Sequence, residues 1–340
     1  MSEIKVSVLC VTYNHAKFIR RALEGIVSQQ TDFAFEAIVH DDASTDGTAD
    51  IVREFAERFP GIVVPIFQIE NQYTRGGCIA RRFLWPRIRG KYVAFCEGDD
   101  YWTDPQKLQL QVDWLDAHPD SGLCFHYTTM HWENGERPDS IYPDEKMVME
   151  GPFTFERLLK RNFIQTSSVM YKWRLKGHED SVPRGIAPGD WYKHLLHAEG
   201  GEIGFIPRAM SVYRRHAGGI WWGSDSRDDA FCLRNGLRHL GFYKAVRERF
   251  GYDNRLAATE MARNTILSAL RAHRFDLLGD LASAFPESFD AGLVDISKDT
   301  ERIDCAAKTA KRASRHLRRF RNLSILLAVL LALAVAALLA

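Results

Sequence analysis

Residues 90–102 have the sequence GKYVAFCEGDDYW, in which an apolar run leads directly into acidic residues. Tyr92–Cys96 has the length and composition of a buried β-strand. Glu97, Asp99 and Asp100 follow it, and three carboxylates so close together repel one another and raise each other's pKa. A divalent cation such as Mn²⁺ or Mg²⁺ relieves this repulsion. The segment therefore predicts a metal site at the end of a strand, with an acidic surface turn as the alternative.

The first 120 residues alternate short apolar runs with amphipathic helical patterns. The expected strands are Lys5–Tyr13, Phe35–His40, Val63–Ile69 and Tyr92–Cys96. Apolar residues recur at helical spacing within 19–27, 52–59 and 108–115. Strands that alternate with helices form right-handed crossovers and a mostly parallel sheet with helices on both faces. The pattern predicts a Rossmann-like α/β fold.

Polar residues follow three of these strands at the point where each strand ends. They are Thr12-Tyr13-Asn14, Asp41-Asp42 and the acidic cluster of residues 97–100. Ligands of parallel sheets bind beyond the carboxyl ends of the strands, so we expect the three segments to share one cleft. The Asp42 carboxylate can accept hydrogen bonds from a nucleotide base or a ribose, and we assign it a ligand role. The alternative is a capped turn, with Ser44 or Thr45 at the start of a helix.

The remaining chain is organised differently. Leu123–Trp132, Ser167–Trp173 and Ile203–Tyr213 are expected to be strands of a mixed sheet, and residues 225–320 have a mostly helical pattern. We predict a catalytic domain over residues 1–220, a helical extension over 221–307, and a basic segment with an apolar helix over 308–340.

The net charge of +1 conceals an uneven distribution. Residues 308–321 contain seven Lys/Arg and no acid, so the rest of the chain has 38 basic and 44 acidic residues. This argues against nucleic-acid binding and indicates one local anionic partner. The next uncharged stretch, Leu323–Ala340, would span about 27 Å as a helix. We predict that this tail associates with an anionic membrane surface, and the alternative is a buried C-terminal helix.

The compartment is predicted from two further features. The segment MSEIKVSVLCVTYN lacks the layout of a signal peptide, and the six cysteines are scattered without a CxxC pair. Both are typical of a reduced, cytosolic chain and argue against a zinc site. Together with the tail, they place the protein at the cytoplasmic face of the cell membrane.

Three segments together resemble the inverting family 2 glycosyltransferases, which have the GT-A fold. They are VLCVTYN at residues 8–14, DDASTDGT at 41–48 and GKYVAFCEGDD at 90–100. Each motif alone is weak, but the three occur in the order and at the spacing of that family. The resemblance covers roughly residues 4–220.

The resemblance implies roles for several of these residues. Thr12-Tyr13-Asn14 and Asp42 would bind the nucleotide base, which is usually uracil in this family. Asp99 would contact the ribose, and Asp100 would bind the metal that bridges the diphosphate. The chain has Glu-Gly-Asp-Asp where many relatives have Asp-x-Asp-Asp or Asp-x-Asp.

An inverting transfer also needs a general base that deprotonates the acceptor hydroxyl. The family has an acid for this role in a Glu-Asp pair at the start of a helix, some 90 residues after the metal motif. Here Gly189-Asp190 occupies that position, so the resemblance implies that Asp190 is the base. Taken alone, Asp190 is equally typical of a helix N-cap.

A basic segment follows the strand expected over residues 203–213. Arg214 and Arg215 suit the charge of a diphosphate leaving group, and His216 is able to complete the metal shell. The alternative is a solvated basic turn. Arg75 is a further candidate for binding phosphate, as are Arg81 and Arg82.

These features predict transfer of a sugar from a nucleoside diphosphate sugar, with UDP expected, to a glycan or lipid-linked saccharide. The Gln-x-x-Arg-Trp motif of processive relatives is absent, which favours a single addition. A sugar-nucleotide pyrophosphorylase is an alternative, but residues 12–17 lack the glycine-rich loop expected for a triphosphate. A non-catalytic nucleotide-sugar-binding protein is another, and it would keep Asp42 and Asp100 without needing a base.

Overall fold

The computed structural model describes residues 3–76, 78–219 and 228–299. The chain divides into two compact units, Met1–Arg184 with Asp190–Trp222, and Gly185–Gly189 with Gly223–Ala340. The basic segment and the apolar tail predicted over 308–340 lie outside the described residues. Within the described part of the chain, no helix combines the length and the apolar character needed to span a bilayer.

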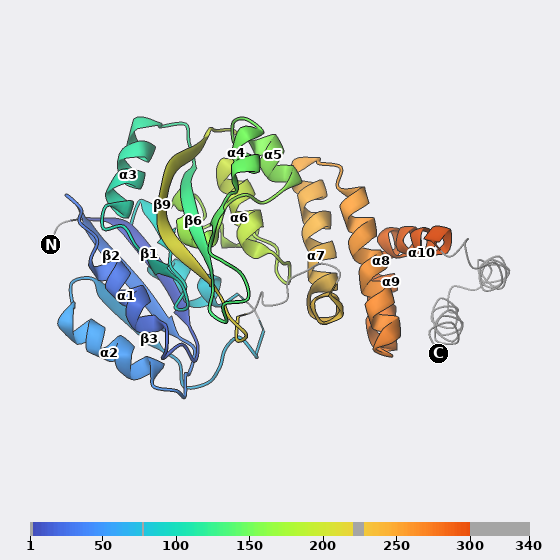
Figure 1. Cartoon of the computed structure of the whole chain (residues 1–340), viewed down its shortest axis with the longest axis horizontal. Helices are drawn as coiled ribbons and strands as arrows, with labels where there is room; N and C mark the ends of the chain where they lie inside the picture. Colours follow the sequence, from blue (N-terminus) through green and yellow to red (C-terminus); the bar gives the residue numbers. More distant parts are fainter. Residues whose placement is uncertain (1–2, 77, 220–227, 300–340) are drawn as a thin grey trace. The chain divides into compact units, whose positions relative to one another are not determined.

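The first unit is built on one nine-stranded sheet (Figure 1). The strand order is β3-β2-β1-β4-β8-β6-β9-β5, and β7 pairs with β6 beside this path. The strands are β1 Ile4–Thr12, β2 Ala34–Asp41, β3 Val63–Phe67, β4 Tyr92–Phe95, β5 Tyr101–Trp102, β6 Leu123–Trp132, β7 Ser140–Tyr142, β8 Met170–Lys172 and β9 Ile203–Arg215.

The predicted α/β architecture is confirmed. β3, β2, β1 and β4 are all parallel, as expected for strands joined by crossover connections. Beyond β4 the sheet is mixed, because β8 is antiparallel to both β4 and β6, and β5 is antiparallel to β9. β6 and β9 are parallel to each other. The expected strand over Ser167–Trp173 is shorter in the structure, because residues 166–168 form a 3₁₀ turn before β8.

The helices of the first unit are α1 Ile19–Val27, α2 Thr48–Arg58, α3 Lys107–Ala117, α4 Glu145–Met149, α5 Phe155–Lys160 and α6 Gly189–Ala198. Short turns of helix lie at η1 Ala80–Leu84, η2 Trp85–Arg87, η3 Thr166–Ser168 and η4 Glu179–Ser181. The second unit contains α7 Asp229–Phe250, α8 Arg255–Arg271, α9 Phe275–Ala284 and α10 Pro286–Asp299. The predicted helical pattern is therefore confirmed for residues 229–299.

Both faces of the sheet are covered. On one face, Val8 of β1 belongs to the same buried cluster as Leu23 of α1 and Val52 of α2. On the other face, the ring of Phe83 from η1 stacks on His40 of β2 at 5.1 Å. Because both faces are buried, the central strands have nearly continuous apolar sequences rather than alternating ones.

The second unit is held together by close contacts between its helices. A Cβ atom on Gly236 of α7 would lie 2.2 Å from Oγ1 of Thr265 in α8, so the glycine allows these helices to approach closely. Asp229, at the start of α7, accepts hydrogen bonds from Ser268 and Arg271 of α8. These contacts fix the pairing of the two longest helices of this unit.

Lys107 places a cationic group inside the core of the first unit. Its Nζ donates a hydrogen bond to Oε1 of Gln111 at 2.7 Å and lies 4.1 Å from the ring centre of Trp102. Within the described part of the chain, no carboxylate forms an ion pair with it. Burial lowers the pKa of Lys107 from 10.5 to about 7.

The buried Lys107 predicts how stability changes with pH. Between the lowered pKa and 10.5, the unfolded chain holds a proton that the folded chain has lost, so stability rises with pH. We expect the free energy of unfolding to increase by about 1.5 kcal/mol from pH 7 to pH 8.5 because of this group. Lys107→Met should lack this increase in urea titrations at the two pH values. The exposed Lys176→Met is the matched control, and equal slopes in wild type and Lys107→Met would contradict the assignment.

Candidate active site

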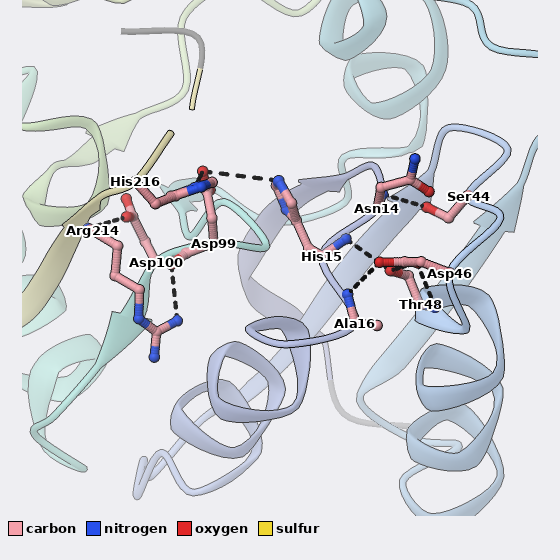
Figure 2. A network of polar contacts seen from close by, with 10 residues as sticks. All are labelled: Asn14, His15, Ala16, Ser44, Asp46, Thr48, Asp99, Asp100, Arg214 and His216. Atoms are coloured by element: carbon pink, nitrogen blue, oxygen red, sulfur yellow. Dashed lines mark hydrogen bonds and ion pairs between the residues drawn. The ribbon is translucent and has the colours of Figure 1, made fainter. Parts of the chain in front are cut away.

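Four segments meet at the carboxyl-terminal edge of the sheet. β1, β2 and β4 are parallel, so residues 12–14, 41–42 and 97–100 follow strand ends on the same side. β8 reverses direction relative to both β4 and β6, and β9 is parallel to β6, so residues 214–216 belong to this edge as well. The three segments predicted to lie together are adjacent, because the N–H of Asp42 donates to the carbonyl of Thr12 and the N–H of Gly98 to the carbonyl of Val11. Figure 2 shows that Arg214 and His216 lie beside Asp99 and Asp100 as well.

Asp99 lies between two histidines. Its Oδ2 atom is 3.1 Å from Nε2 of His216 and 3.9 Å from Nε2 of His15. One ligand atom from each of the three residues lies within 4.8 Å of the other two. Burial raises the pKa of Asp99, but the hydrogen bond from His216 and the charge of His15 outweigh it and leave the pKa lowered. Burial lowers the pKa of His15, which favours the neutral imidazole that a metal requires.

Asp100 points away from this cluster. Its Oδ1 atom accepts a hydrogen bond from the backbone N–H of Arg214 at 3.0 Å, and its Oδ2 atom has no hydrogen-bond partner among the described residues. Burial, followed by the charges of Asp99 and Glu97, raises its pKa well above the usual value.

Asp99 rather than Asp100 lies beside His216, so Asp99 occupies the position that the resemblance implied for Asp100. The reason is the tight turn after β4, in which the N–H of Asp100 donates to the carbonyl of Glu97. This turn directs the Asp100 side chain inward to the backbone of β9, while Asp99 remains half-buried at the site.

Two further acids predicted at the site are Glu97, on the turn after β4, and Asp190, at the start of α6. The Glu97 side chain is exposed to solvent at its surface. Partial desolvation of its carboxyl group by the surrounding protein, followed by the charges of Asp99 and Asp190, raises its pKa to about 7. Asp190 lies in the first turn of α6, and its Oδ2 atom accepts a hydrogen bond from Thr166 at 3.0 Å.

Asp42 anchors a loop in this structure. It is 1% exposed, and its two carboxylate oxygens accept the backbone N–H groups of Gln72 at 2.8 Å and Tyr73 at 3.0 Å. The predicted direct contact between Asp42 and a nucleotide base is not supported by this geometry. Tyr13 and Tyr73 are instead the exposed aromatic residues on the two segments that Asp42 adjoins. Tyr73 carried no distinguishing signal in the sequence.

Thr12 and Asn14 also make their contacts inside the protein. Thr12 is buried, and a Cβ atom on Gly98 would lie 2.5 Å from its Oγ1. Asn14 adopts a left-handed backbone conformation (φ 53°), and its Oδ1 accepts the N–H of Thr45 at 2.9 Å. Of the three residues in the predicted base-binding segment, Tyr13 is the one with a large exposed side chain.

Three of the five arginines that are candidates for binding phosphate occupy different environments. Arg214 is 6% exposed and is held by the carbonyl of Asp99 and the carboxylate of Glu133, so its guanidinium supports the acidic turn. This corrects the prediction that Arg214 binds the diphosphate. Arg215 is half-buried against the ring of Trp132 at 5.0 Å. Arg75 is exposed and forms an ion pair with Glu70.

The arrangement as a whole is that of an enzyme of the Rossmann-like α/β class, with carboxylates and imidazoles at the ligand-binding edge of a parallel sheet. Residues 7–217 match glycosyl transferase family 2, and the chain belongs to this family. The resemblance in the sequence is thereby confirmed, and the first unit contains a glycosyltransferase domain.

Individual relatives match part or all of the chain. Uncharacterized protein Rv1520 of Mycobacterium tuberculosis is 44% identical over 216 residues, which is 64% of this chain and 60% of the relative. The UDP-Glc:alpha-D-GlcNAc-diphosphoundecaprenol beta-1,3-glucosyltransferase WfaP of Escherichia coli is 32% identical over 128 residues, or 38% of this chain and 47% of WfaP. S. aureus TarS 1–349 in complex with UDP-GlcNAc has a TM-score of 0.53 at 18% identity over 92% of each chain, a likeness in fold.

Gly98 predicts a test of the packing beneath the acidic turn. A methyl group there would lie 2.5 Å from Oγ1 of Thr12 and 3.0 Å from Nδ1 of His15, so both side chains must move. We expect Gly98→Ala to lower the free energy of unfolding by about 1–3 kcal/mol. Gly61→Ala, where no atom lies within 4 Å of the added methyl group, is the matched control. Equal urea midpoints for the two variants would show that this packing is looser than described.

Proposed function

We propose that the protein is a metal-dependent, inverting glycosyltransferase that moves one sugar from a nucleoside diphosphate sugar to a saccharide or lipid-linked acceptor. UDP is the expected nucleotide. The observation that carries the proposal is the pairing of Asp99 with His216 at the carboxyl-terminal edge of the parallel strands, where Oδ2 and Nε2 lie 3.1 Å apart. Asp190, the predicted base, lies in the first turn of α6.

The residues present fit a divalent metal. Neighbouring ligands of an octahedral ion lie about 3 Å apart, and Oδ2 of Asp99 is 3.1 Å from Nε2 of His216. Asp99 and His216 would hold the ion, which supplies positive charge against the diphosphate of the donor. An imidazole ligand favours Mn²⁺ over Mg²⁺, since Mg²⁺ prefers oxygen ligands.

Asp190 would act as the general base. It takes the proton of the acceptor hydroxyl as that oxygen forms a bond to the anomeric carbon of the donor sugar. The bond from this carbon to the diphosphate oxygen breaks on the opposite side, the nucleoside diphosphate leaves, and the configuration inverts. The hydrogen bond from Thr166 orients the Asp190 carboxylate for this role.

Two relatives indicate which donors and acceptors proteins of this kind use. The name of WfaP states that it transfers glucose from UDP-Glc to a lipid-diphosphate-linked sugar, and TarS was crystallised with UDP-GlcNAc. We extend the donor class, and a lipid-linked or other saccharide acceptor, to this protein.

The role of Asp190 is tested by Asp190→Asn. We expect transfer to fall by about 10²–10⁴-fold, because the amide cannot accept the acceptor proton, while the Kd for UDP in the presence of Mn²⁺ is unchanged. Transfer is measured as UDP release from a panel of UDP-sugars with saccharide and lipid-linked acceptors, and UDP binding by calorimetry. The exposed Asp120→Asn is the matched control.

Three outcomes would change the proposal. Full activity in Asp190→Asn would mean that a different group is the base. Binding of UDP-sugars by wild type without transfer to any acceptor would favour the non-catalytic nucleotide-sugar-binding protein. Failure of wild type to bind any nucleoside diphosphate would remove the basis for a sugar donor of this class.

We also propose that residues 308–340 bring the enzyme to the cytoplasmic face of an anionic membrane, on the basis of seven Lys/Arg beside an uncharged apolar stretch. The full chain should float with vesicles that contain phosphatidylglycerol. Replacing the seven basic residues by Gln should reduce binding to these vesicles but leave binding to neutral vesicles unchanged. No binding of wild type to either kind of vesicle would exclude membrane association of this segment.

A further inference from the structure

The loop between β1 and α1 contributes a histidine that the sequence did not single out. His15 directs Nε2 toward Oδ2 of Asp99 at 3.9 Å (Figure 2), and its ligand atom lies within 4.8 Å of that of His216. The two imidazole rings are 6.1 Å apart and nearly perpendicular, at 84°. Their side chains are only 18% and 11% exposed, so both rings are largely shielded from water.

The backbone around His15 is fixed by the start of α2. The N–H of His15 donates to Oγ1 of Thr48 at 2.8 Å, and the N–H of Ala16 donates to Oδ2 of Asp46 at 2.9 Å. Asp46 in turn accepts the hydroxyl of Thr48 at 2.6 Å. These hydrogen bonds within the protein position the backbone of His15 without a bound nucleotide.

The segment opposite His15 is shaped to receive it. Gly98 has no side chain, and a Cβ atom at this position would lie 3.0 Å from Nδ1 of His15. The glycine thus allows the imidazole to approach the turn that carries Asp99. The ring of His15 also packs edge-to-face with Phe18 at 6.2 Å, which limits its rotation.

We propose that His15 is a third protein ligand of the metal, beside Asp99 and His216, and that the ion consequently binds before the nucleotide. This inference rests on the proposed metal-dependent function. The three ligand atoms lie within 4.8 Å of one another, so small side-chain rotations bring them to the roughly 4 Å maximum allowed around one ion. Ions held by only one or two protein groups depend on substrate phosphates for the rest of their shell. A third, preformed ligand reduces that dependence.

The proposed ligand set also favours Mn²⁺ over Mg²⁺. Two imidazoles and one carboxylate suit Mn²⁺ better than Mg²⁺, which prefers an all-oxygen shell. Positions that the protein does not fill would be open to water and to diphosphate oxygens of the donor. The link from Thr48 through His15 also connects the metal to the start of α2.

The test is a titration of the full chain with Mn²⁺ in the absence of nucleotide, followed by electron paramagnetic resonance. Wild type should bind one Mn²⁺, and the nitrogen couplings should correspond to two imidazoles. His15→Phe keeps a ring of similar size without a ligand atom. It should weaken Mn²⁺ binding by at least about tenfold and leave one imidazole coupling. His118→Phe, whose ring stacks on Trp114 away from the site, is the matched control.

Further measurements separate this proposal from the one on which it rests. Thr48→Val removes the acceptor of the His15 N–H and should weaken Mn²⁺ binding less than His15→Phe does. Unchanged Mn²⁺ affinity and unchanged nitrogen coupling in a folded His15→Phe variant would overturn the role of His15 and leave the proposed function intact. Mn²⁺ binding by wild type only when UDP is present would overturn the binding order. Absence of Mn²⁺ binding with and without UDP would instead refute metal dependence itself.

Discussion

The repulsion among the three carboxylates after β4 is the constraint to which the rest of the site conforms. Glu97, Asp99 and Asp100 lie on one turn at the mouth of a buried strand, where unpaired negative charge is costly. Each acid is accommodated differently. Asp100 is buried and accepts a hydrogen bond from a backbone N–H of β9, and Asp99 is paired with imidazoles. Glu97 has its pKa raised to about 7. The turn therefore holds the paired charge of Asp99 in a fixed position, and the raised pKa values of Glu97 and Asp100 reduce the negative charge of the other two carboxyl groups.

A second layer of polar residues keeps this turn and its neighbouring loops in place. Asp42, Asn14 and Asp46 accept backbone N–H groups from loops at the ends of β1, β2 and β3. Arg214 holds the backbone of Asp99 from the side of β9. These hydrogen bonds, which are charge-assisted where Asp42, Asp46 or Arg214 takes part, fix loops that have no regular structure of their own. Side chains that resemble ligands in the sequence, such as Asp42 and Arg214, therefore hold the loops at this edge of the sheet in place.

The fold was predictable because its signals are local. Apolar runs such as those of β1 and β4, and helical stripes such as that of α1, follow from the periodicity of burial along the chain. The shared edge of the sheet follows from the same pattern, since parallel strands end on one side. The lengths of β8 and of the turn before it depend on pairing with β4 and β6, which distant residues determine.

The sequence by itself determined the family, the parallel core and the set of segments that meet at the site. Only the tertiary structure decided which member of each segment faces inward. Asp99 and Asp100 are adjacent and chemically alike, and a single turn separates their environments. His15 became a site residue because Thr48 and Gly98, from two other segments, fix where its ring lies. Side-chain direction at a loop depends on contacts with residues far away in the chain, and no local pattern records those contacts.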